Sequence, residues 1–215
     1  MTDLPDLDLA AEIFMAWVAE DIVVLDIRAD AYVLIPDAAK LMQPVRNGGG
    51  VRGDAAVLDD LVEAGLAAPT HVRQRRMLAP ATSELRLLHT APPISGLVAF
   101  GHALTATAAF KRRNLAALVE AARWRKRGAR RADLAGAVRE AGAFEAVRPW
   151  VPFEGDCLQR SWMLHDHLCR TGIDADWVFG VRTWPFFAHC WVQVGDAVVG
   201  DTLNRVRGFT PIMAI

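Results

Sequence analysis

Two short apolar runs near the start of the chain alternate with turn-forming residues. Positions 22–27 and 31–35 are largely apolar and flank a polar turn at positions 28–30, a pattern typical of two strands. The proline that opens residues 36–42 favours a helix there. The chain is thus predicted to begin with a small sheet, and the apolar run at positions 13–18 is ambiguous between strand and helix.

A longer helical pattern follows a glycine-rich break at residues 48–50. From Asp54, apolar residues recur three and four positions apart, and Gly65 follows the last of them. Aspartate is a favoured N-cap and glycine a favoured terminator, so these residues mark the ends of a predicted helix. The sequence predicts a small domain of strands and helices over residues 1–78.

The middle of the chain is predicted to be helical behind a proline-containing connector. Residues 79–92 are predicted to be a linker. Beyond it, apolar residues at spacings of three and four predict helices over residues 95–110, 114–126 and 132–144, and Asn114 is placed to cap the second.

The last third combines a predicted helix with a predicted hairpin. Asp156 is placed to cap a helix that begins at Cys157 and keeps an apolar stripe on one face. His189 and Asp201 lie in two extended runs, and the glycine–aspartate pair at residues 195–196 predicts a tight turn between them. Such a hairpin would bring the imidazole and the carboxylate onto neighbouring strands.

The charge is distributed in three blocks. The chain has 215 residues, 53% of them hydrophobic, which is enough for one large or two small globular domains. Its net charge is −1, yet residues 1–70 carry −9, residues 71–149 carry +10 and residues 150–215 carry −2. The basic block is equally consistent with a binding face and with solvated arginine-rich helices.

Several classes of protein are disfavoured. No apolar stretch is typical of a membrane span, and the acidic start lacks the basic region of a signal peptide, so we expect a cytoplasmic protein without membrane contact. Three cysteines do not suggest a disulfide framework, and aromatic residues are too sparse in the basic block for nucleic-acid binding.

The histidines outside the hairpin suggest no metal site. His165 and His167 are two positions apart on the predicted helix, so they point in nearly opposite directions and cannot bind one ion. We predict that both are surface groups. His102 has no partner at an informative spacing.

Cys157, His189 and Asp201 form a candidate catalytic triad. A helix N-terminus favours thiolate over thiol, and the thiolate is the nucleophile. His189 would take and return the thiol proton, while Asp201 would fix the tautomer and orientation of the ring. Each residue alone is more typical of a structural role, but the three together favour acyl transfer to sulfur, which needs no metal or organic cofactor.

The residues around the triad resemble those of a known family. The motifs CLxRS from Cys157, AHxWV around His189 and VxD ending at Asp201, with the closing FTPI, are similar to the transglutaminase-like peptidase domain of lasso-peptide B proteins. Cys190 departs from the pattern, because the family more often has alanine there. On a strand its side chain would point away from that of His189. The resemblance covers roughly residues 85–215.

This resemblance implies an α+β protein, with a small winged-helix-like N-terminal domain followed by a transglutaminase-like (papain-like) cysteine peptidase domain over residues 93–215. In the family, the triad belongs to a leader peptidase that cuts a ribosomally made precursor. A partner ATP-dependent, asparagine-synthetase-like cyclase then closes the ring. The implied function is hydrolysis of the leader–core bond through a cysteine thioester during lasso-peptide antibiotic biosynthesis.

The N-terminal domain carries a second resemblance. Leu25, Asp26, Tyr32 and the AGL at residues 64–66 are similar to winged-helix leader-recognition elements such as the peptide chaperone of pyrroloquinoline quinone biosynthesis. This implies that residues 1–78 bind the leader as an added strand, with Leu25 and Tyr32 among the substrate-binding residues. The alternative is a strand-and-helix cap without a ligand.

A loop before His189 is rich in aromatic residues. Trp184, Phe186 and Phe187 combine turn chemistry with large apolar surface, so they are candidate substrate-binding residues that wall a peptide cleft. The alternative is that they cover the edge of the sheet.

Other functions remain open. An amine in place of water would give a transglutaminase or an N-acyltransferase with the same triad, and a noncatalytic adaptor could deliver the precursor to the cyclase. A winged-helix DNA regulator is disfavoured by the −9 charge of residues 1–70, because phosphate contacts need basic residues.

Overall fold

The chain forms two compact units. The computed structural model describes residues 5–68, 75, 78–87, 93–129, 132–151 and 155–215. The first unit comprises residues 1–78, 181–187 and 210–212, and the second comprises residues 79–180, 188–209 and 213–215. The main division follows residue 78, but two short segments from late in the sequence cluster with the first unit, which the sequence did not predict.

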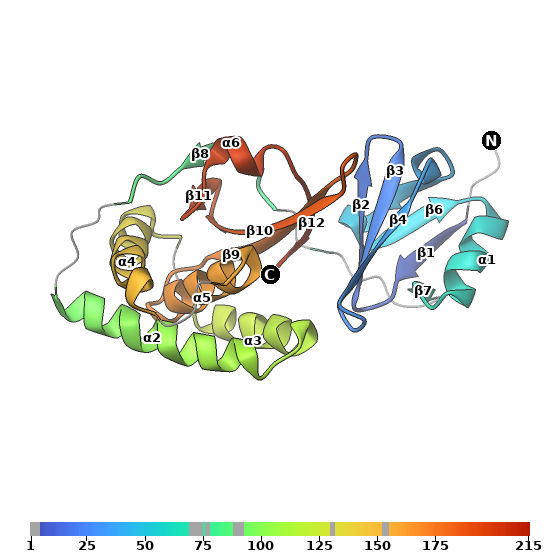
Figure 1. The fold of residues 1–215 in the computed structure, drawn as a ribbon. Coiled ribbons are helices and arrows are strands. Elements are labelled where there is room, and N and C mark those ends of the chain that lie inside the picture. The colour runs from blue at the N-terminus through green and yellow to red at the C-terminus, as the bar shows by residue number, and fades with distance from the viewer. Residues whose placement is uncertain (1–4, 69–74, 76–77, 88–92, 130–131, 152–154) are drawn as a thin grey trace. The chain divides into compact units, whose positions relative to one another are not determined.

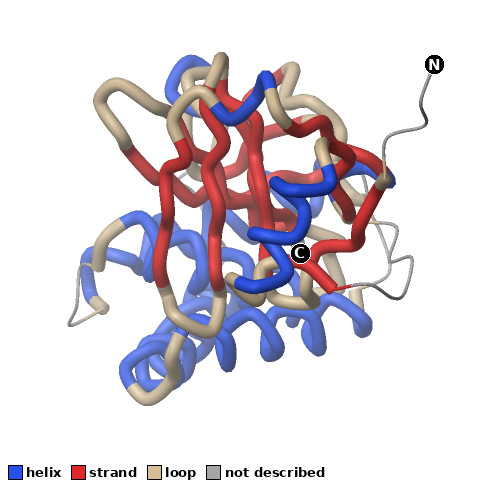
Figure 2. The backbone as a smooth tube through the Cα atoms, turned by 90° about the vertical axis from the view of Figure 1, so that its right-hand side faces the viewer, coloured by secondary structure: helices blue, strands red, loops and turns tan. Residues whose placement is uncertain are grey.

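The first unit consists mainly of strands (Figures 1 and 2). One sheet has the strand order β5-β6-β1-β7 and the other the order β2-β3-β4, with antiparallel pairing throughout. Its elements are β1 (Asp6–Leu9), β2 (Ile13–Val18), β3 (Asp21–Asp26), β4 (Ala31–Ile35), β5 (Met42–Val45), β6 (Gly50–Gly53), α1 (Ala55–Glu63) and β7 (Ala67–Ala68), with 3₁₀ turns at Ala38–Lys40 and Arg46–Gly48.

Most of the local predictions for this unit are confirmed. The two apolar runs form β3 and β4, the ambiguous run forms β2, and α1 follows Asp54. Gly65 has φ +70°, the left-handed conformation that ends helices and that glycine adopts without strain. Among the described residues of the unit, α1 is the only α-helix.

The prediction of a helix over residues 36–42 is wrong. Only a 3₁₀ turn forms at Ala38–Lys40, and Met42 already begins β5. The side chain of Met42 is 3% exposed, and its carbonyl accepts a hydrogen bond from the Trp17 indole at 3.0 Å. Proline at the start of this segment favours a helix, but tertiary packing overrides that local preference and the chain is extended from Met42.

The apolar core of the first unit contains strand residues two positions apart and helix residues three positions apart. Ile22 and Val24 alternate along β3, while Leu58 and Leu61 are three apart on α1, and all are at most 5% exposed. They belong to one apolar cluster. Burial of each such side chain stabilises the unit by about 1.5–3 kcal/mol.

The second unit is a mixed sheet with its longer helices, α2 to α5, gathered on one side (Figure 1). Its five strands have the order β12-β9-β10-β11-β8, although residues 181–182 of β9, residue 187 of β10 and residues 210–212 of β12 cluster with the first unit. The elements are β8 (Ser83–Glu84), α2 (Pro93–Lys111), α3 (Leu115–Gly128), α4 (Leu134–Val147), a 3₁₀ turn at Arg148–Trp150, α5 (Cys157–Arg170), β9 (Asp176–Arg182), β10 (Phe187–Val194), β11 (Ala197–Val199), α6 (Leu203–Val206) and β12 (Thr210–Ala214).

Caps and aromatic packing hold this unit together. The three helices predicted in the middle of the chain form α2, α3 and α4, and the Asn114 side chain accepts the Ala117 amide at 3.0 Å, as the sequence predicts. Trp162 on α5 and Trp177 on β9 are at most 1% exposed and their rings lie 5.6 Å apart. Truncating a buried tryptophan costs about 3–5 kcal/mol, so this contact fixes α5 on the sheet.

Part of the predicted linker belongs to the sheet. Ser83 and Glu84 form β8, which pairs in parallel with β11. The Thr82 and Leu85 amides also donate to the hairpin, at 2.9 Å each. Residues 79–92 are therefore not only a connector.

Part of the basic block has an internal role. Arg125 donates to Asp166 at 2.9 Å, and Arg170 pairs with the other oxygen of this buried carboxylate at 2.7 Å. Lys126 binds Asp176 and donates to the Ile215 carbonyl at 2.9 Å. These residues neutralise carboxylates of their own unit, which explains some of the positive charge without an external partner.

The prediction that His165 and His167 lie on the surface is wrong, because both are 0% exposed. His165 stacks on Trp177, and His167 has its Nδ1 atom 3.0 Å from Nδ1 of His102, a contact between residues 65 positions apart. Sequence spacing could not find this contact, since α2 and α5 meet only in the tertiary structure.

Acid is expected to weaken the second unit. Burial lowers the pKa of His165 to about 3 and that of His167 to about 4, from an ordinary 6.5. Below pH 6.5 the unfolded chain binds protons that the folded chain does not, so stability is fully present above that pH and is lost as the pH falls toward 4. Calorimetry should show a lower unfolding temperature at about pH 5 than at pH 7.

A matched variant tests whether the buried histidines cause this loss of stability in acid. His165→Phe keeps a ring against Trp177 but removes one of the two titrations, so its unfolding temperature should fall less between pH 7 and 5. An equal fall in both proteins would show that these histidines do not carry the effect.

In the part of the chain that the structure describes, no helix has the length and apolar character needed to cross a membrane.

Candidate active site

The site begins at the N-terminus of α5. The carboxylate of Asp156 accepts the Gln159 amide at 3.2 Å, so Asp156 is the N-cap that the sequence predicts and Cys157 is the first helical residue. The N–H groups of the first turn lack intrahelical acceptors, and the dipole is positive there. The Cys157 thiol is thus placed where a negative charge is stabilised.

Two residues of α5 hold its first turn in place. The Ser161 hydroxyl donates to the Cys157 carbonyl at 2.7 Å and accepts the Trp177 indole N–H at 2.8 Å. Arg160 donates to Glu145 of α4 at 3.2 Å and to the Gly200 carbonyl at 2.9 Å. Since Gly200 precedes Asp201, Arg160 links the helix of the nucleophile to the segment that carries the carboxylate.

The β10–β11 hairpin brings His189 and Asp201 together. Gly195 has φ +62° in the turn, and Val192 pairs with Val199, as the predicted hairpin requires. The Nε2 atom of His189 lies 2.6 Å from Oδ2 of Asp201. This contact leaves Nδ1 as the ring nitrogen available to the thiol.

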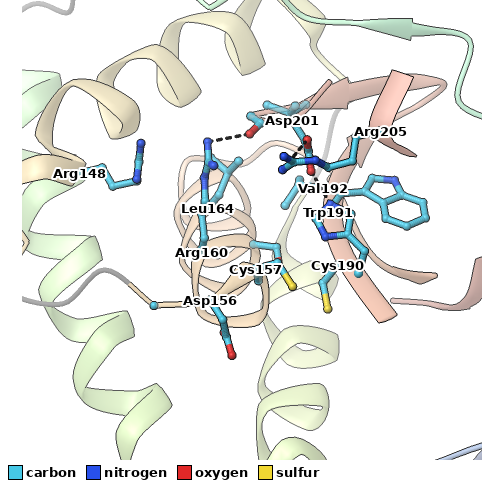
Figure 3. Close-up of a pocket in the computed structure, with 15 residues that line it drawn as sticks. Arg148, Asp156, Cys157, Arg160, Leu164, Cys190, Trp191, Val192, Asp201 and Arg205 are labelled. Atoms are coloured by element: carbon cyan, nitrogen blue, oxygen red, sulfur yellow. Dashed lines mark hydrogen bonds and ion pairs between the residues drawn. The ribbon is translucent and has the colours of Figure 1, made fainter. Parts of the chain in front are cut away.

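These side chains line one pocket of about 240 Å³ (Figure 3). Its wall is formed by the start of α5, the first half of β10 and the segment after β11. The residues that line it are Arg148, Gly155, Asp156, Cys157, Arg160, Ser161, Leu164, His189, Cys190, Trp191, Val192, Val199, Gly200, Asp201 and Arg205. The structure thus places all three predicted triad residues in a single cavity of the second unit.

The environment separates the pKa values of the thiol and the imidazole. Hydrogen bonding with Cys190 and with His189 lowers the pKa of Cys157 to about 4, although burial opposes the shift. Hydrogen bonding with Asp201 and with Cys157 raises the pKa of His189 to about 9, again against burial. Between these values the pair is a thiolate and an imidazolium, the reactive form of a cysteine nucleophile.

Asp201 is held as a carboxylate. Burial alone would raise its pKa, but hydrogen bonds from His189 and from the Thr202 amide, with the charges of His189 and Arg205, outweigh burial and lower the pKa. The Thr202 amide donates to Oδ1 at 2.7 Å, which leaves Oδ2 for the imidazole. Asp201 can therefore orient the ring and stabilise its positive charge.

Cys190 is a site residue that the sequence did not identify. Strand alternation predicts that its side chain points away from that of His189, yet both residues line the pocket and hydrogen bond with Cys157, and Figure 3 shows the two sulfur atoms near each other. Hydrogen bonding with Cys157, followed by burial, raises the pKa of the Cys190 thiol well above its ordinary value. Cys190 thus stays protonated and can donate to the thiolate.

The candidate substrate-binding residues lie outside this pocket. Leu25 is 0% exposed in the middle strand β3, so the expectation that it contacts a leader is corrected: it is a core residue. Tyr32 lies on β4, an edge strand, with its ring 5.7 Å from that of Phe186. Trp184, 75% exposed, donates its indole N–H to Asp21 at 2.7 Å.

Phe187 is the remaining aromatic candidate. It is 53% exposed and stacks under the Arg182 guanidinium, 4.9 Å from the ring centre. Residues 181–187 cluster with the first unit, together with Tyr32. The structure therefore brings the exposed aromatic candidates to the first unit and the triad to the second.

No group of three or more histidine, cysteine, aspartate or glutamate side chains in the described ranges is arranged to hold a metal ion.

The chain is similar to known proteins over part of its length. A family model described as the transglutaminase-like superfamily matches residues 101–214, just over half of the chain. The microcin J25-processing protein McjB of Escherichia coli is 48% identical over 52 residues, which is 24% of this chain and 25% of McjB. The matched segment thus spans about a quarter of that relative. No solved structure matches the chain significantly.

The ion pair predicts how Cys157 reacts with an alkylating agent. Because its thiolate persists down to a pKa of about 4, iodoacetamide should modify Cys157 at pH 6 nearly as fast as at pH 8. Asp201→Asn removes the largest stabiliser of the imidazolium, so the pKa of Cys157 should rise and the rate at pH 6 should fall relative to the rate at pH 8. Mass spectrometry of the Cys157 peptide measures both rates.

The control is Asp196→Asn, the same substitution in the hairpin turn, which should leave the rate at pH 6 unchanged. A wild-type rate that rises steeply between pH 6 and 8 would exclude a preformed ion pair.

Proposed function

This chain belongs to the transglutaminase-like superfamily, and on that basis we propose that it is a cysteine peptidase that removes the leader from a ribosomally made lasso-peptide precursor. The observation that carries the proposal is the Cys157–His189–Asp201 arrangement, with a thiol of low pKa beside an imidazolium held by a carboxylate 2.6 Å away. The resemblance of the triad motifs to lasso-peptide B proteins and the similarity to a microcin J25-processing protein support the substrate class.

The proposed reaction proceeds through a thioester. The Cys157 sulfur attacks the carbonyl carbon of the leader–core bond, and His189 gives its proton to the departing core amine. His189 then takes a proton from water, whose oxygen attacks the thioester and releases the leader carboxylate and the thiolate. The free amide groups that begin a helix favour negative charge, so in this proposal those at the start of α5 bind the negative oxygen of each tetrahedral intermediate.

An amine acceptor is the second candidate, and the superfamily match favours it. Water and an amine react with the same thioester, so the pocket serves either reaction. The product distinguishes them: hydrolysis gives a leader with a free carboxylate, whereas a transglutaminase or N-acyltransferase gives a leader joined to the amine.

We assign leader binding to the first unit. The strand order leaves β4 at the edge of its sheet, where an extended peptide can add as a further strand. Tyr32 lies on β4 and contacts Phe186, so an aromatic surface adjoins that edge. The acidic character of residues 1–70 favours a leader with basic residues near its anchor. The family resemblance also supports an ATP-dependent cyclase as the partner that receives the core.

Substitution of the triad tests the peptidase activity. Cys157→Ala and His189→Ala should abolish cleavage, because each removes a group that takes part in bond making or proton transfer. Asp201→Asn should lower kcat by about 10²–10⁴-fold and leave residual cleavage, since orientation is lost but the nucleophile remains. The assay incubates each purified variant with a lasso-peptide precursor and determines the masses of the products by mass spectrometry.

Cys169→Ala provides a matched cysteine control. Cys169 is on the same helix, 4% exposed, and burial raises its pKa to about 12, so its loss should not stop cleavage. Normal cleavage by Cys157→Ala would end the peptidase proposal.

Leader recognition is tested separately with the full-length Cys157→Ala chain and a fluorescent leader peptide. Tyr32→Ala should weaken binding by about tenfold, because it removes an aromatic contact worth roughly 1.4 kcal/mol. Val33→Ala, at the next position of β4 and on the opposite face of the strand, should change binding little. Equal affinities for all three proteins would place leader recognition elsewhere.

A further inference from the structure

The helix α2 is apolar on both faces, with the larger residues outside. Its buried face holds the small residues Ala99, Ala103 and Ala106, each at most 1% exposed. Its outward face holds Ile94 and Leu97, which are 77% and 73% exposed. A helix that packed only within its own unit would bury its larger apolar residues and expose polar ones. The reversed arrangement indicates that another surface covers the outward face.

The outward residues form one continuous stripe. They recur three and four positions apart along a helix about 28 Å long, and none is charged. We call them the α2 stripe: Ile94, Leu97, Val98, Gly101, Leu104, Thr105 and Ala108. Figure 1 shows α2 at the outside of the helices of the second unit. An apolar surface of this kind on a folded protein marks an interaction site.

We propose that the α2 stripe is the interface of a homodimer, in which α2 packs antiparallel against α2 of a second copy around a twofold axis near Gly101. The stripe is centred on this glycine, with members three, four and seven positions away on each side. Among the described residues, apart from its chain neighbours and the backbone of α2 itself, no atom lies within 4 Å of the place where a Cβ of Gly101 would be. The two backbones can therefore approach closely at the axis.

The side chains of the stripe are complementary to themselves in size. Antiparallel packing around Gly101 places Ile94 of one copy level with Ala108 of the other, and Leu97 level with Thr105. Ile94 and Leu97 thus each face a smaller residue, while Val98 of one copy lies level with Leu104 of the other and adds an aliphatic contact next to the axis. A twofold axis repeats each of these contacts.

The charges favour the same arrangement. The basic run Lys111, Arg112 and Arg113 ends α2 and follows it, and the stripe has no carboxylate that would neutralise this run in a second copy. Antiparallel packing separates the two basic runs by about 30 Å, well beyond the screening length of about 8 Å. Parallel packing would bring six positive charges together. A second copy in antiparallel orientation is thus the occupant that fits both the shape and the charge.

Sedimentation velocity on the full-length protein over a range of concentrations tests the dimer. We expect a species of twice the 23.5 kDa chain mass, and Leu97→Glu should weaken association at least roughly tenfold by burying a charge in the interface. Leu134→Glu is the matched control, because Leu134 is 45% exposed at the start of α4, outside the stripe, and should leave the dimer intact.

Disulfide trapping tests the orientation without relying on a charged variant. In a Cys157→Ala background, Gly101→Cys should cross-link to itself with diamide, since the axis passes near it. Ile94→Cys should not cross-link to itself, because the two copies lie about 20 Å apart along the axis, but should cross-link to Ala108→Cys in a mixture. Self-linking of Ile94→Cys would overturn the antiparallel arrangement.

Other outcomes reject the proposal. A monomer at all concentrations, or a dimer that Leu97→Glu does not weaken, would overturn it. Sedimentation of the monomer with phosphatidylglycerol-containing vesicles, lost in Leu97→Glu, would assign the stripe to a membrane surface instead. A monomer that does not bind vesicles would indicate that the α2 stripe binds a different protein.

Discussion

The guanidinium of Arg160 is the contact on which the geometry of the site depends. It binds Glu145 on α4 and the Gly200 carbonyl, and so fixes the helix that begins with Cys157 against the residue before Asp201. Hydrogen bonds of an ionised group are worth about 1.5–3 kcal/mol each and are directional, so they restrict sliding as well as separation. The nucleophile and the carboxylate lie on a helix and on a loop with no strand pairing between them, and Arg160 joins these two backbone segments outside the triad itself.

Once this geometry is fixed, the electrostatics of the pocket follow. Asp201 stabilises the imidazolium of His189, the imidazolium stabilises the thiolate of Cys157, and the Cys190 thiol supplies a further hydrogen bond. His189 and Cys190 are buried and Cys157 and Asp201 are half-buried, and in such surroundings neighbouring charges act more strongly than in water. The acyl transfer that we propose needs this charged pair before substrate arrives, and in that proposal the choice between water and an amine depends on which of them the pocket admits afterwards.

The helix α2 has a different role on each of its two faces. The alanines on the inner face of α2 allow α5 to approach closely, and the Trp162 indole then donates to the Ala106 carbonyl at 3.2 Å. Close packing on the inside leaves the larger aliphatic side chains of α2 outside. The same helix thus supports the catalytic helix and presents an apolar face, which connects the stability of the site to the assembly of the protein.

Local chemistry in the sequence determined much of this protein. The caps Asn114 and Asp156, the turn glycine Gly195 and the period of apolar residues gave the helices of the second unit and the hairpin. The position of Cys157 at a helix start and of His189 on a strand identified the two central residues of the candidate active site. Each of these signals acts within a few residues, where backbone conformation and side-chain hydrogen bonding are set by neighbours in the chain.

Only the tertiary structure decided which distant residues meet. Leu25 became core because β3 is a central strand, and the segment at Met42 became a strand because its partner β6 pairs with it. His167 became buried because α2 supplies His102, and Cys190 entered the site because the start of α5 brings Cys157 beside both His189 and Cys190. Periodicity gives the direction of a side chain from its own element, but what lies in that direction depends on packing between elements far apart in sequence.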